Sequence, residues 1–491
     1  MKKACLLILD GAGYSTTEHG NAVTSETLPR MFGHMQEHGF CVLEAASEAV
    51  GLEAGQVGNS EAGHLTIGAG AVVPCMTKRI CIAFDDGSWR DDEGWQIARE
   101  AGVLHLVGLV SDAGVHGLAR TIVQSAQTAR AAGVDEVHVH PVLDGVDSLK
   151  GTAPRLLEEL RSQLEALNGV HLGVVFGRKW FCDRSGDLDV TRVAVDALGG
   201  KTELATFTPE SLTAHLSNEV AGEMSFPARL FAGGRPIAAG EPVLITSHRA
   251  DRARQAARVL GDEHPVLMLV DPGQDVPVQH VFFPQEPLTR GLAHELARAG
   301  LRSARIAEKC KFPHVTFFLN GFDAGAEGEG HCIPSIPEGE IPAKPEMSLA
   351  EVTDEIVKHL ESSDARAVIA NLANLDQVGH LGRLDLATTA ARVVDEAFER
   401  IARAAWENGW TLMVTADHGN AERVEDEGGT PFGSHTDGPV PFLIQPAPGR
   451  RTQWRAEHGS LAQVASTYLL ALGLEAPEWM EPPLAVLEVE G

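Results

Sequence analysis

The chain has 491 residues and a formal net charge of −28, from 40 Lys and Arg against 68 Asp and Glu. Its length predicts about two to four domains. Because so acidic a surface repels phosphate backbones, we expect no nucleic-acid partner. Apolar runs stay well below the roughly 18 residues of a membrane span, so we expect no membrane partner either. Seven scattered cysteines without a C-x-x-C pair indicate a reducing compartment, and we expect a cytoplasmic protein.

Short β-rich runs alternate with longer helical patterns along the chain, which is typical of α/β architecture. The expected strands cover 4–9, 104–109, 136–142, 173–176, 242–245, 315–319, 367–370 and 411–415. The expected helices cover 119–132, 155–166, 250–260, 349–361, 385–408 and 460–472.

Three apolar runs end in an aspartate: they lead into Asp10, Asp376 and Asp417. Ligands of an open α/β sheet gather at the carboxyl ends of its strands. Three carboxylates delivered there would repel one another unless a cation lies between them. This pattern predicts a metal site.

Histidines accompany these aspartates, namely His380, His418 and His435. A single Asp-x-x-x-His could equally be a capping aspartate beside a surface histidine. The repeated pattern favours a mixed carboxylate and imidazole site, which suits Mn²⁺, Zn²⁺ or Fe²⁺ better than Ca²⁺. So many ligands exceed what one tetrahedral ion takes and suit a pair of ions, the arrangement that clamps phosphoryl transfer.

The segment Gly55-Gln-Val-Gly-Asn-Ser60-Glu-Ala-Gly-His64 offers a nucleophile. Glycines flank Ser60, and a helix-like start follows it, so backbone N–H groups would face an anion there. A metal-bound serine can attack without a histidine base. The alternative is that Ser60 only caps the helix. The spacing is not Gly-x-Ser-x-Gly, which disfavours the esterase elbow.

Cationic side chains in the middle of the chain suggest an anion pocket. They are Arg178, Arg184, Arg249 and Arg252, with Lys311 further on, before the expected strand 315–319. Arg249 and Arg252 are three apart at a helix start and can fork onto phosphate or carboxylate oxygens. In so acidic a chain, each could instead pair with a surface acid.

His138 and His140 form a His-x-His pair at a strand end, as in some metal sites. Alternation along a strand points both rings to one face. Because no pattern of further ligands follows, we do not expect a metal there.

Nine blocks in order over nearly the whole chain resemble the cofactor-independent (2,3-bisphosphoglycerate-independent) phosphoglycerate mutases of the alkaline-phosphatase-like superfamily. They are LLILDG, GQVGNSEAGHLTIGAG, GLVSDAGVHG, RADRARQ, RIAEKCKFPHVTFFLNG, KPEMSLAEVTD, NLANLDQVGHLG, TADHGN and SHTDGPVPFL. The resemblance implies an α/β fold, an alkaline-phosphatase-like doubly wound sheet with an inserted second α/β transferase domain. Residues 1–74 and 288–491 would form the dimetal domain, and 78–284 the inserted substrate-binding domain.

The resemblance also implies roles for individual residues. One divalent ion would be held by Asp376, His380 and His435. The other would be held by Asp10, Ser60, Asp417 and His418. Mn²⁺ is the expected ion, with Zn²⁺ or another divalent ion as the alternative. Ser60 would carry the phosphoryl group in the interconversion of 3-phosphoglycerate and 2-phosphoglycerate by a monomer. The substrate pocket would contain His116, Asp147, Arg178, Arg184, Arg249, Arg252 and Lys311, with Asp147 handling the proton of the acceptor hydroxyl.

Departures from the family pattern lie mainly in the expected substrate domain. Val146 stands where the family's Asp-Gly-Arg-Asp motif has its arginine, and Ala71 also replaces a family arginine. This leaves alternatives open. One is a specialised homologue that transfers another phosphoryl-type group to a small substrate, such as phosphonoformyl from a nucleotide-activated donor to a glycerate hydroxyl in phosphonate natural-product biosynthesis. Others are a phosphatase and a catalytically inactive binding homologue.

Overall fold

The computed structural model describes residues 2–183, 186–217, 222–325, 328–362, 364–426 and 428–489. The chain forms two compact units. Unit 1 consists of Met1–Cys75 and Glu286–Gly491, and unit 2 is Met76–Gln285. Unit 2 is therefore an insertion in the chain of unit 1, and its ends lie next to the boundaries expected from the sequence.

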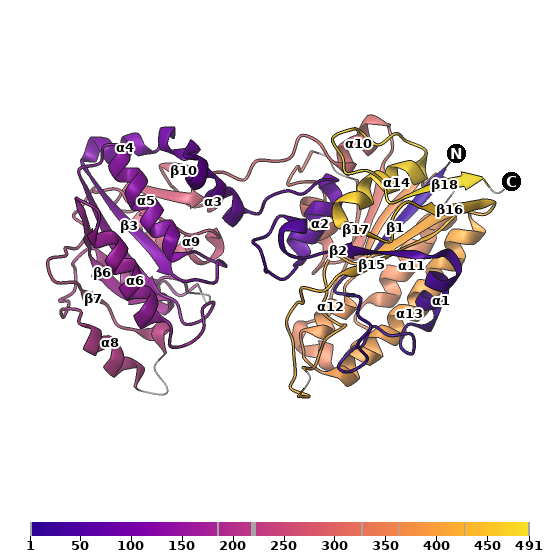
Figure 1. Cartoon of the computed structure of the whole chain (residues 1–491), viewed down its shortest axis with the longest axis horizontal. Coiled ribbons are helices and arrows are strands. Elements are labelled where there is room, and N and C mark those ends of the chain that lie inside the picture. Colours follow the sequence, from indigo (N-terminus) through magenta and orange to yellow (C-terminus); the bar gives the residue numbers. More distant parts are fainter. Residues whose placement is uncertain are drawn as a thin grey trace. The chain divides into compact units, whose positions relative to one another are not determined.

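Unit 1 is built on a mixed sheet with the strand order β12-β11-β13-β1-β14-β15-β2-β17 (Figure 1). Its strands are β1 (Lys3–Leu9), β2 (Phe40–Glu44), β11 (Ser303–Glu308), β12 (Glu329–Ile333), β13 (Ala367–Leu372), β14 (Trp410–Thr415), β15 (Val440–Gln445) and β17 (His458–Ser460), and β16 (Arg450–Trp454) pairs separately with β18 (Ala485–Val489). Strand β1 runs parallel to both β13 and β14, and β11 runs parallel to β13. The carboxyl ends of these four strands therefore share one edge of the sheet.

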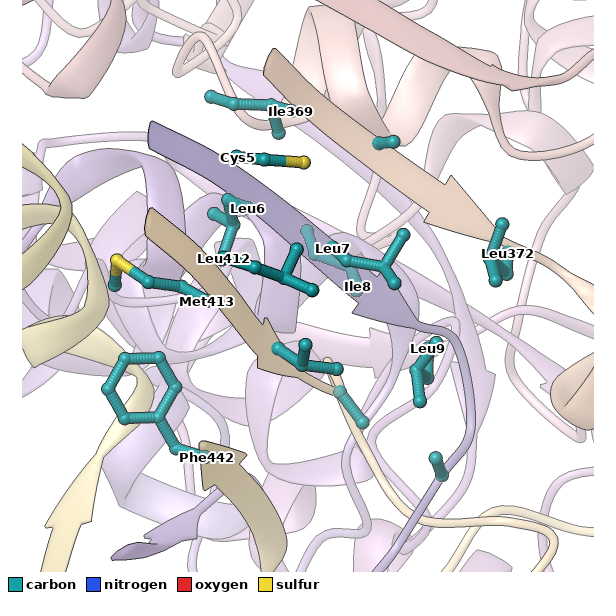
Figure 2. Close-up of a cluster of buried hydrophobic side chains, with 14 of the residues drawn as sticks. Cys5, Leu6, Leu7, Ile8, Leu9, Ile369, Leu372, Leu412, Met413 and Phe442 are labelled. Atoms are coloured by element: carbon teal, nitrogen blue, oxygen red, sulfur yellow. The ribbon is translucent and has the colours of Figure 1, made fainter. Parts of the chain in front are cut away.

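Helices cover both faces of this sheet. One group is α1 (Pro29–His38), α11 (Leu349–Glu361) and α13 (Leu384–Glu407), and the other is α2 (Ser60–Ala69), α10 (Leu292–Arg298) and α14 (Val464–Leu472), with the short α12 (Asn374–Gly379) after β13 (Figure 1). Strand β1 is buried from Ala4 to Leu9. Figure 2 shows its side chains between Ile369 of β13 and Leu412 of β14. A strand covered on both faces has to be apolar throughout, which explains the unbroken run in the sequence.

Unit 2 has its own, largely parallel sheet in the order β10-β9-β8-β3-β4-β6-β7, with β5 beside β4. Its elements are β3 (Val103–Val110), β4 (Glu136–Leu143), β5 (Val170–Leu172), β6 (Val174–Gly177), β7 (Arg229–Leu230), β8 (Val243–Ile245), β9 (Val266–Val270), β10 (His280–Phe283), α3 (Met76–Asp86), α4 (Trp95–Ala101), α5 (Ala119–Ala131), α6 (Ala153–Glu165), α7 (Leu188–Leu198), α8 (Pro209–Leu216) and α9 (Arg254–Leu260). Leu104 and Leu106 join the core under α5 and α6, whereas Val107 and Leu109 join the core under α7 and α9. This alternation along β3 is that of a sheet between two helix layers, so the expected doubly wound α/β class is confirmed.

The prediction of a strand at 315–319 is wrong. His314–Phe318 form a short π-helical turn, η6, which follows Pro313. Val315 and Leu319 are buried four residues apart, and Thr316 Oγ1 donates to the carbonyl of Phe312 at 2.7 Å. A five-residue apolar run is too short for its periodicity to separate a strand from a helical turn. Lys311 therefore lies after β11 and does not lead into a strand.

The other expected strands and all six expected helices are present with small shifts at their ends. The helix expected over 250–260 is divided into a 3₁₀ turn, Ala250–Arg252, and α9. The helix expected from residue 460 begins as α14 at Val464, after a 3₁₀ turn. Within the described part of the chain, every helix is too short or too polar to cross a membrane.

Candidate functional site

Three buried aspartates converge at the carboxyl edge of the unit 1 sheet. Asp10 follows β1, Asp417 follows β14, and Asp376 lies on α12 just beyond β13. Because β13, β1 and β14 are neighbours, the side chains meet. Lys311 Nζ lies 2.6 Å from Asp10 Oδ1 and 2.8 Å from Asp376 Oδ2. One ammonium group thus faces an excess of negative charge.

Three imidazoles point into the same cluster. His380, His418 and His435 each place Nδ1 on a backbone carbonyl, those of Gly433, Gly419 and Gly58, at 2.9, 3.2 and 2.8 Å. A ring that donates its Nδ1–H to a carbonyl keeps a lone pair on Nε2. The Nε2 atoms of His380 and His435 each lie 3.2 Å from Asp376 Oδ1 and 3.2 Å from one another. Converging lone pairs and carboxylate oxygens repel one another unless a cation lies between them, so these residues fit a metal site.

The residues form overlapping groups whose ligand atoms lie within 4.8 Å of one another. The groups are Asp376 with His380 and His435; Asp10 with Asp376 and His418; and Asp10 with His64 and Asp417. The first is the trio expected for one ion. The other two contain the Asp10, Asp417 and His418 expected for the second ion, and they add His64. Overlapping sets of mixed oxygen and nitrogen ligands suit a pair of divalent ions.

The electrostatics of the aspartates follow from burial and from Lys311. Burial and the charge of Asp417 raise the pKa of Asp10, in spite of the neighbouring Lys311. Burial alone would raise the pKa of Asp376 too, but the charge of Lys311 and the neighbouring imidazoles of His380 and His435 hold it well below its usual value. Burial acts to lower the pKa of Lys311, and the aspartates raise it, so the ammonium stays charged. A bound cation would add to the positive charge of Lys311 and would offset the remaining repulsion at the Asp10 carboxylate.

Ser60 lies inside this cluster at the first turn of α2. The helix cap is Asn59, whose side chain accepts from the N–H of Ala62. The hydroxyl of Ser60 is therefore not needed as a cap. Its Oγ lies 2.7 Å from Lys311 Nζ, 2.9 Å from His418 Nε2 and 3.4 Å from Asp10 Oδ1. A buried hydroxyl beside an ammonium group and a helix amino terminus is well placed to develop negative charge.

A second cluster lies at the carboxyl edge of the unit 2 sheet. His116 Nδ1 lies 2.7 Å from Asp147 Oδ2, and Arg178 NH1 lies 2.9 Å from that same oxygen. Arg178 NH1 also donates to Asp144 Oδ1 at 2.5 Å. Burial acts to raise the pKa of Asp147, but His116 and Arg178 lower it below its usual value. Asp147 is therefore held as an ionised carboxylate.

The remaining expected pocket residues are placed as follows. Arg249 and Arg252 lie on the segment after β8, next to the loop of His116, and the N–H of His248 donates to the carbonyl of His116 at 2.8 Å. Lys311 belongs to the unit 1 cluster. Arg184 lies outside the described residues.

Residues that were not predicted complete the unit 1 cluster. His64 is fully buried, with Nδ1 2.9 Å from the carbonyl of Ser60 and 3.1 Å from Asp417 Oδ2. Asn371 donates to Asp10 Oδ2 at 2.7 Å, and Asn420 donates to Asp376 Oδ1 at 3.1 Å. His64 could have been found, because it lies four residues after Ser60 on one helix face. The asparagines carry no such local signal.

His140 of the His138-x-His140 pair belongs to a chain of hydrogen bonds inside unit 2. The N–H of Val174 donates to His140 Nδ1 at 2.9 Å, His140 Nε2 lies 2.9 Å from His105 Nδ1, and His105 Nε2 lies 2.8 Å from Glu241 Oε2. These contacts form one chain of neutral rings, in which both nitrogens of His140 are used.

The sequence and the fold match known proteins over almost their whole length. The family model of the metalloenzyme superfamily matches residues 2–476 of the sequence. The 2,3-bisphosphoglycerate-independent phosphoglycerate mutase of Moorella thermoacetica is 36% identical, over 97% of this chain and 96% of the relative. That of a Picosynechococcus strain is 35% identical, over 97% and 95%.

A crystal structure of Leishmania mexicana phosphoglycerate mutase at low cobalt concentration shares the fold. It is 27% identical, has a TM-score of 0.74, and the match covers 99% of this chain and 98% of that one. The identity, the full-length coverage and the metal-ligand cluster agree, and the chain belongs to the 2,3-bisphosphoglycerate-independent phosphoglycerate mutases of the metalloenzyme superfamily.

Proposed function

We propose that this chain interconverts 3-phosphoglycerate and 2-phosphoglycerate through a phosphoryl group carried on Ser60. The observation that supports this most is the environment of Ser60 Oγ, 2.7 Å from Lys311 Nζ and 2.9 Å from His418 Nε2 at a helix amino terminus. The names of the full-length relatives support the same substrate. We expect the protein to act as a monomer in the cytoplasm.

The transfer has two steps that mirror each other. Ser60 Oγ attacks the phosphorus of 3-phosphoglycerate, and the bond between phosphorus and the C3 oxygen breaks. The proton of the Ser60 hydroxyl ends on the departing C3 oxygen, so that the products are phosphoserine and glycerate. Glycerate then offers its 2-hydroxyl to the phosphoserine, which restores Ser60 and forms 2-phosphoglycerate. Lys311 stabilises negative charge on Ser60 Oγ, and the first turn of α2 points its N–H groups at the phosphoryl oxygens.

Two divalent ions, which we expect to be Mn²⁺, would be held by Asp376, His380 and His435 and by Asp10, Ser60, Asp417 and His418. When bound, they supply positive charge to the phosphoryl oxygens and to the serine. Carboxylate and imidazole donors together suit Mn²⁺, and they suit Zn²⁺ as well.

The unit 2 cluster would recognise the glycerate part. Arg249 and Arg252 supply guanidinium groups for carboxylate or phosphate oxygens. Asp147 is held as an ionised carboxylate by His116 and Arg178, and an ionised carboxylate can accept the proton of an attacking hydroxyl.

Phosphorus NMR tests this proposal directly. The Mn²⁺-loaded protein is mixed with 3-phosphoglycerate, and we expect 2-phosphoglycerate to appear at an enzyme-like rate. Ser60→Ala, with its metal content measured, is the control. Release of inorganic phosphate without 2-phosphoglycerate would instead make the protein a phosphatase.

One observation favours a second candidate. Val146 is 52% exposed in the loop between Asp144 and Asp147, where the family motif has an arginine. Valine in place of arginine removes a charge-assisted contact to the substrate, and the exposed apolar side chain suits a different donor. Transfer of a phosphonate such as phosphonoformyl from a nucleotide-activated donor to a glycerate hydroxyl would use the same Ser60. If 3-phosphoglycerate gives no product while metal is bound, such donors are the next substrates to test.

A further inference from the structure

A separate cluster of histidine and glutamate side chains lies in unit 1, on other elements than the centre described above. Glu329 and His331 lie on β12, the edge strand of the sheet, and Glu355 and His359 lie on α11. Residues two apart on a strand and four apart on a helix each share a face. One ligand atom from each of Glu329, His331 and His359 lies within 4.8 Å of the other two. The cluster shares no residue with the aspartate centre.

His359 is oriented like a metal ligand. Its Nδ1 lies 2.8 Å from the carbonyl of Glu355, one turn earlier on α11, and the side chain is 12% exposed. Donation of the Nδ1–H to that carbonyl leaves the lone pair on Nε2. His380, His418 and His435 show the same arrangement in the aspartate centre. A backbone carbonyl on the far nitrogen fixes both the tautomer and the direction of the ring.

His331 is held in a similar way by a carboxylate. Its Nδ1 lies 3.1 Å from Glu355 Oε1, and its Nε2 lies 3.5 Å from Glu329 Oε1. Among the described residues, Nε2 is buried and has no hydrogen-bond partner. In the neutral ring, a lone pair on Nε2 would face a carboxylate oxygen, which is unfavourable unless a cation lies between them.

The two rings also face each other across a short gap. The ring centroids of His331 and His359 are 4.4 Å apart, with planes at 68°. Zn²⁺ with bonds of about 2.0–2.1 Å separates tetrahedral ligand atoms by about 3.4 Å. From their 4.8 Å limit, the three ligand atoms need to approach one another by at most about 1.4 Å. Glu329 can do so because its side chain is 64% exposed.

We propose that His331, His359 and Glu329 form a third metal site, which binds Zn²⁺ or a similar transition-metal ion between β12 and α11. Two imidazoles and one carboxylate suit such an ion better than Mg²⁺ or Ca²⁺. Glu355 orients His331 as a hydrogen-bonding partner behind the ligand. The fourth position is left to water, as in other sites with three protein ligands. The ion ties the edge strand of the sheet to a helix that covers it.

The site is tested by counting zinc ions. Wild type and the double variant His331→Gln/His359→Gln are incubated with Zn²⁺ at pH 7.5. Unbound zinc is removed by gel filtration, and the zinc content per chain is measured by inductively coupled plasma mass spectrometry. We expect the variant to hold one ion fewer per chain than wild type, whatever the aspartate centre retains. Glu361→Gln removes an exposed carboxylate from the same helix outside the cluster, and we expect it to match wild type.

A single substitution at an exposed position separates a loss of zinc binding from a loss of the fold. Glu329→Gln changes an exposed side chain, and we expect zinc at this site to bind at least about tenfold more weakly. Four-coordinate Co²⁺ absorption in wild type, lost in part in both cluster variants, gives a second readout. Equal zinc counts in wild type and the double variant, with both folded by circular dichroism, would overturn the proposal. So would an unchanged zinc affinity in Glu329→Gln.

Discussion

Both units place their charged residues at the carboxyl edge of a largely parallel sheet, but the two edges balance their charges differently. In unit 1, Asp10, Asp376 and Asp417 share one ammonium group, that of Lys311, and burial and Asp417 raise the pKa of Asp10. In unit 2, Arg178 bridges two carboxylates, those of Asp144 and Asp147.

The difference shows what each edge can bind. The pKa of Asp144 and that of Asp147 are lowered, although burial acts to raise both, because hydrogen bonds from neighbouring backbone N–H groups, from Arg178 and from His116 favour the ionised form. The unit 2 edge is thus satisfied by the protein itself. The unit 1 edge keeps an excess of carboxylates and imidazole lone pairs, which suits divalent cations. We therefore expect the same kind of sheet edge to serve metal binding in one unit and recognition of a small anion in the other.

The largest effect is expected at Ser60. Because Ser60→Ala removes the attacking oxygen but leaves the ligands around it, we expect phosphoryl transfer to fall by roughly 10⁴-fold or more. The rate is measured by phosphorus NMR, and Ser15→Ala is the control. Turnover within tenfold of wild type would exclude Ser60 as the carrier.

Removal of metal should affect one unit and spare the other. Without cations, the three aspartates of unit 1 face only Lys311, so we expect a chelator to abolish activity and to lower the stability of unit 1 by about 3 kcal/mol. Hydrogen exchange followed by mass spectrometry reports this segment by segment. Exchange should rise at the carboxyl ends of β1, β13 and β14 and stay unchanged in β3 and β4. An equal rise in both sheets would contradict the difference between the edges.

Acid should destabilise unit 2 through its buried histidines. Burial lowers the pKa of His105 to about 4, although Glu241 acts to raise it. The unfolded chain then binds the extra proton first, so this contribution is complete above about pH 6.5 and is lost as the pH falls towards 4. The loss amounts to about 3 kcal/mol for this residue. Urea unfolding between pH 7.5 and 4 should show a flatter pH dependence in His105→Gln, while the exposed His171→Gln keeps the wild-type slope. Equal slopes in all three proteins would contradict this assignment.

We expect the loss of Arg178 to affect substrate binding more than it affects the reaction at Ser60. Arg178→Ala leaves Asp144 and Asp147 without their shared guanidinium, and we expect kcat/KM to fall tenfold to a hundredfold, equivalent to about 1.5–3 kcal/mol. Arg178→Lys should recover part of this loss, because lysine retains the positive charge but lacks the planar guanidinium that contacts two carboxylates at once. Steady-state kinetics with 3-phosphoglycerate measures both. A loss of metal in Arg178→Ala would show that the two edges are not separate in function.

The smallest effect is expected at Val146. If the pocket has been adapted to another donor, Val146→Arg should raise kcat/KM for 3-phosphoglycerate by about tenfold, the value of one charge-assisted bond. Leu149→Arg, at an 81% exposed position of the same segment, is the matched control. An unchanged substrate preference in Val146→Arg would remove the main reason to consider phosphonate donors.

Much of the unit 1 centre could be predicted because topology alone determines it. Runs that end in Asp10, Asp376 and Asp417 belong to neighbouring parallel strands, so the residues meet without any detailed packing. Asn371 and Asn420 could not be found in this way, since they contact the aspartates only through the folded chain. The role of Ser60 as a cap could be excluded only once Asn59 was seen to fill it.

The error at 315–319 has a similar origin. The run Val-Thr-Phe-Phe-Leu has β propensity, but Pro313 starts a helical turn and tertiary contacts decide the outcome: Arg305 NH1 donates to the carbonyl of Val315 at 3.2 Å. That turn follows Lys311, whose Nζ reaches Asp10 and Ser60. Short apolar segments are therefore the places where periodicity gives too little information.

Ser60 is the residue that we propose to carry the transferred group. The most direct test mixes the metal-loaded protein with 3-phosphoglycerate, quenches it in acid within one turnover, and maps phosphopeptides by mass spectrometry. We predict a phosphoryl group on the peptide that contains Ser60, formed as fast as the product appears, and absent from Ser60→Ala. Product formation without phosphorylated Ser60, or with the phosphoryl group on another residue, would contradict this role of Ser60.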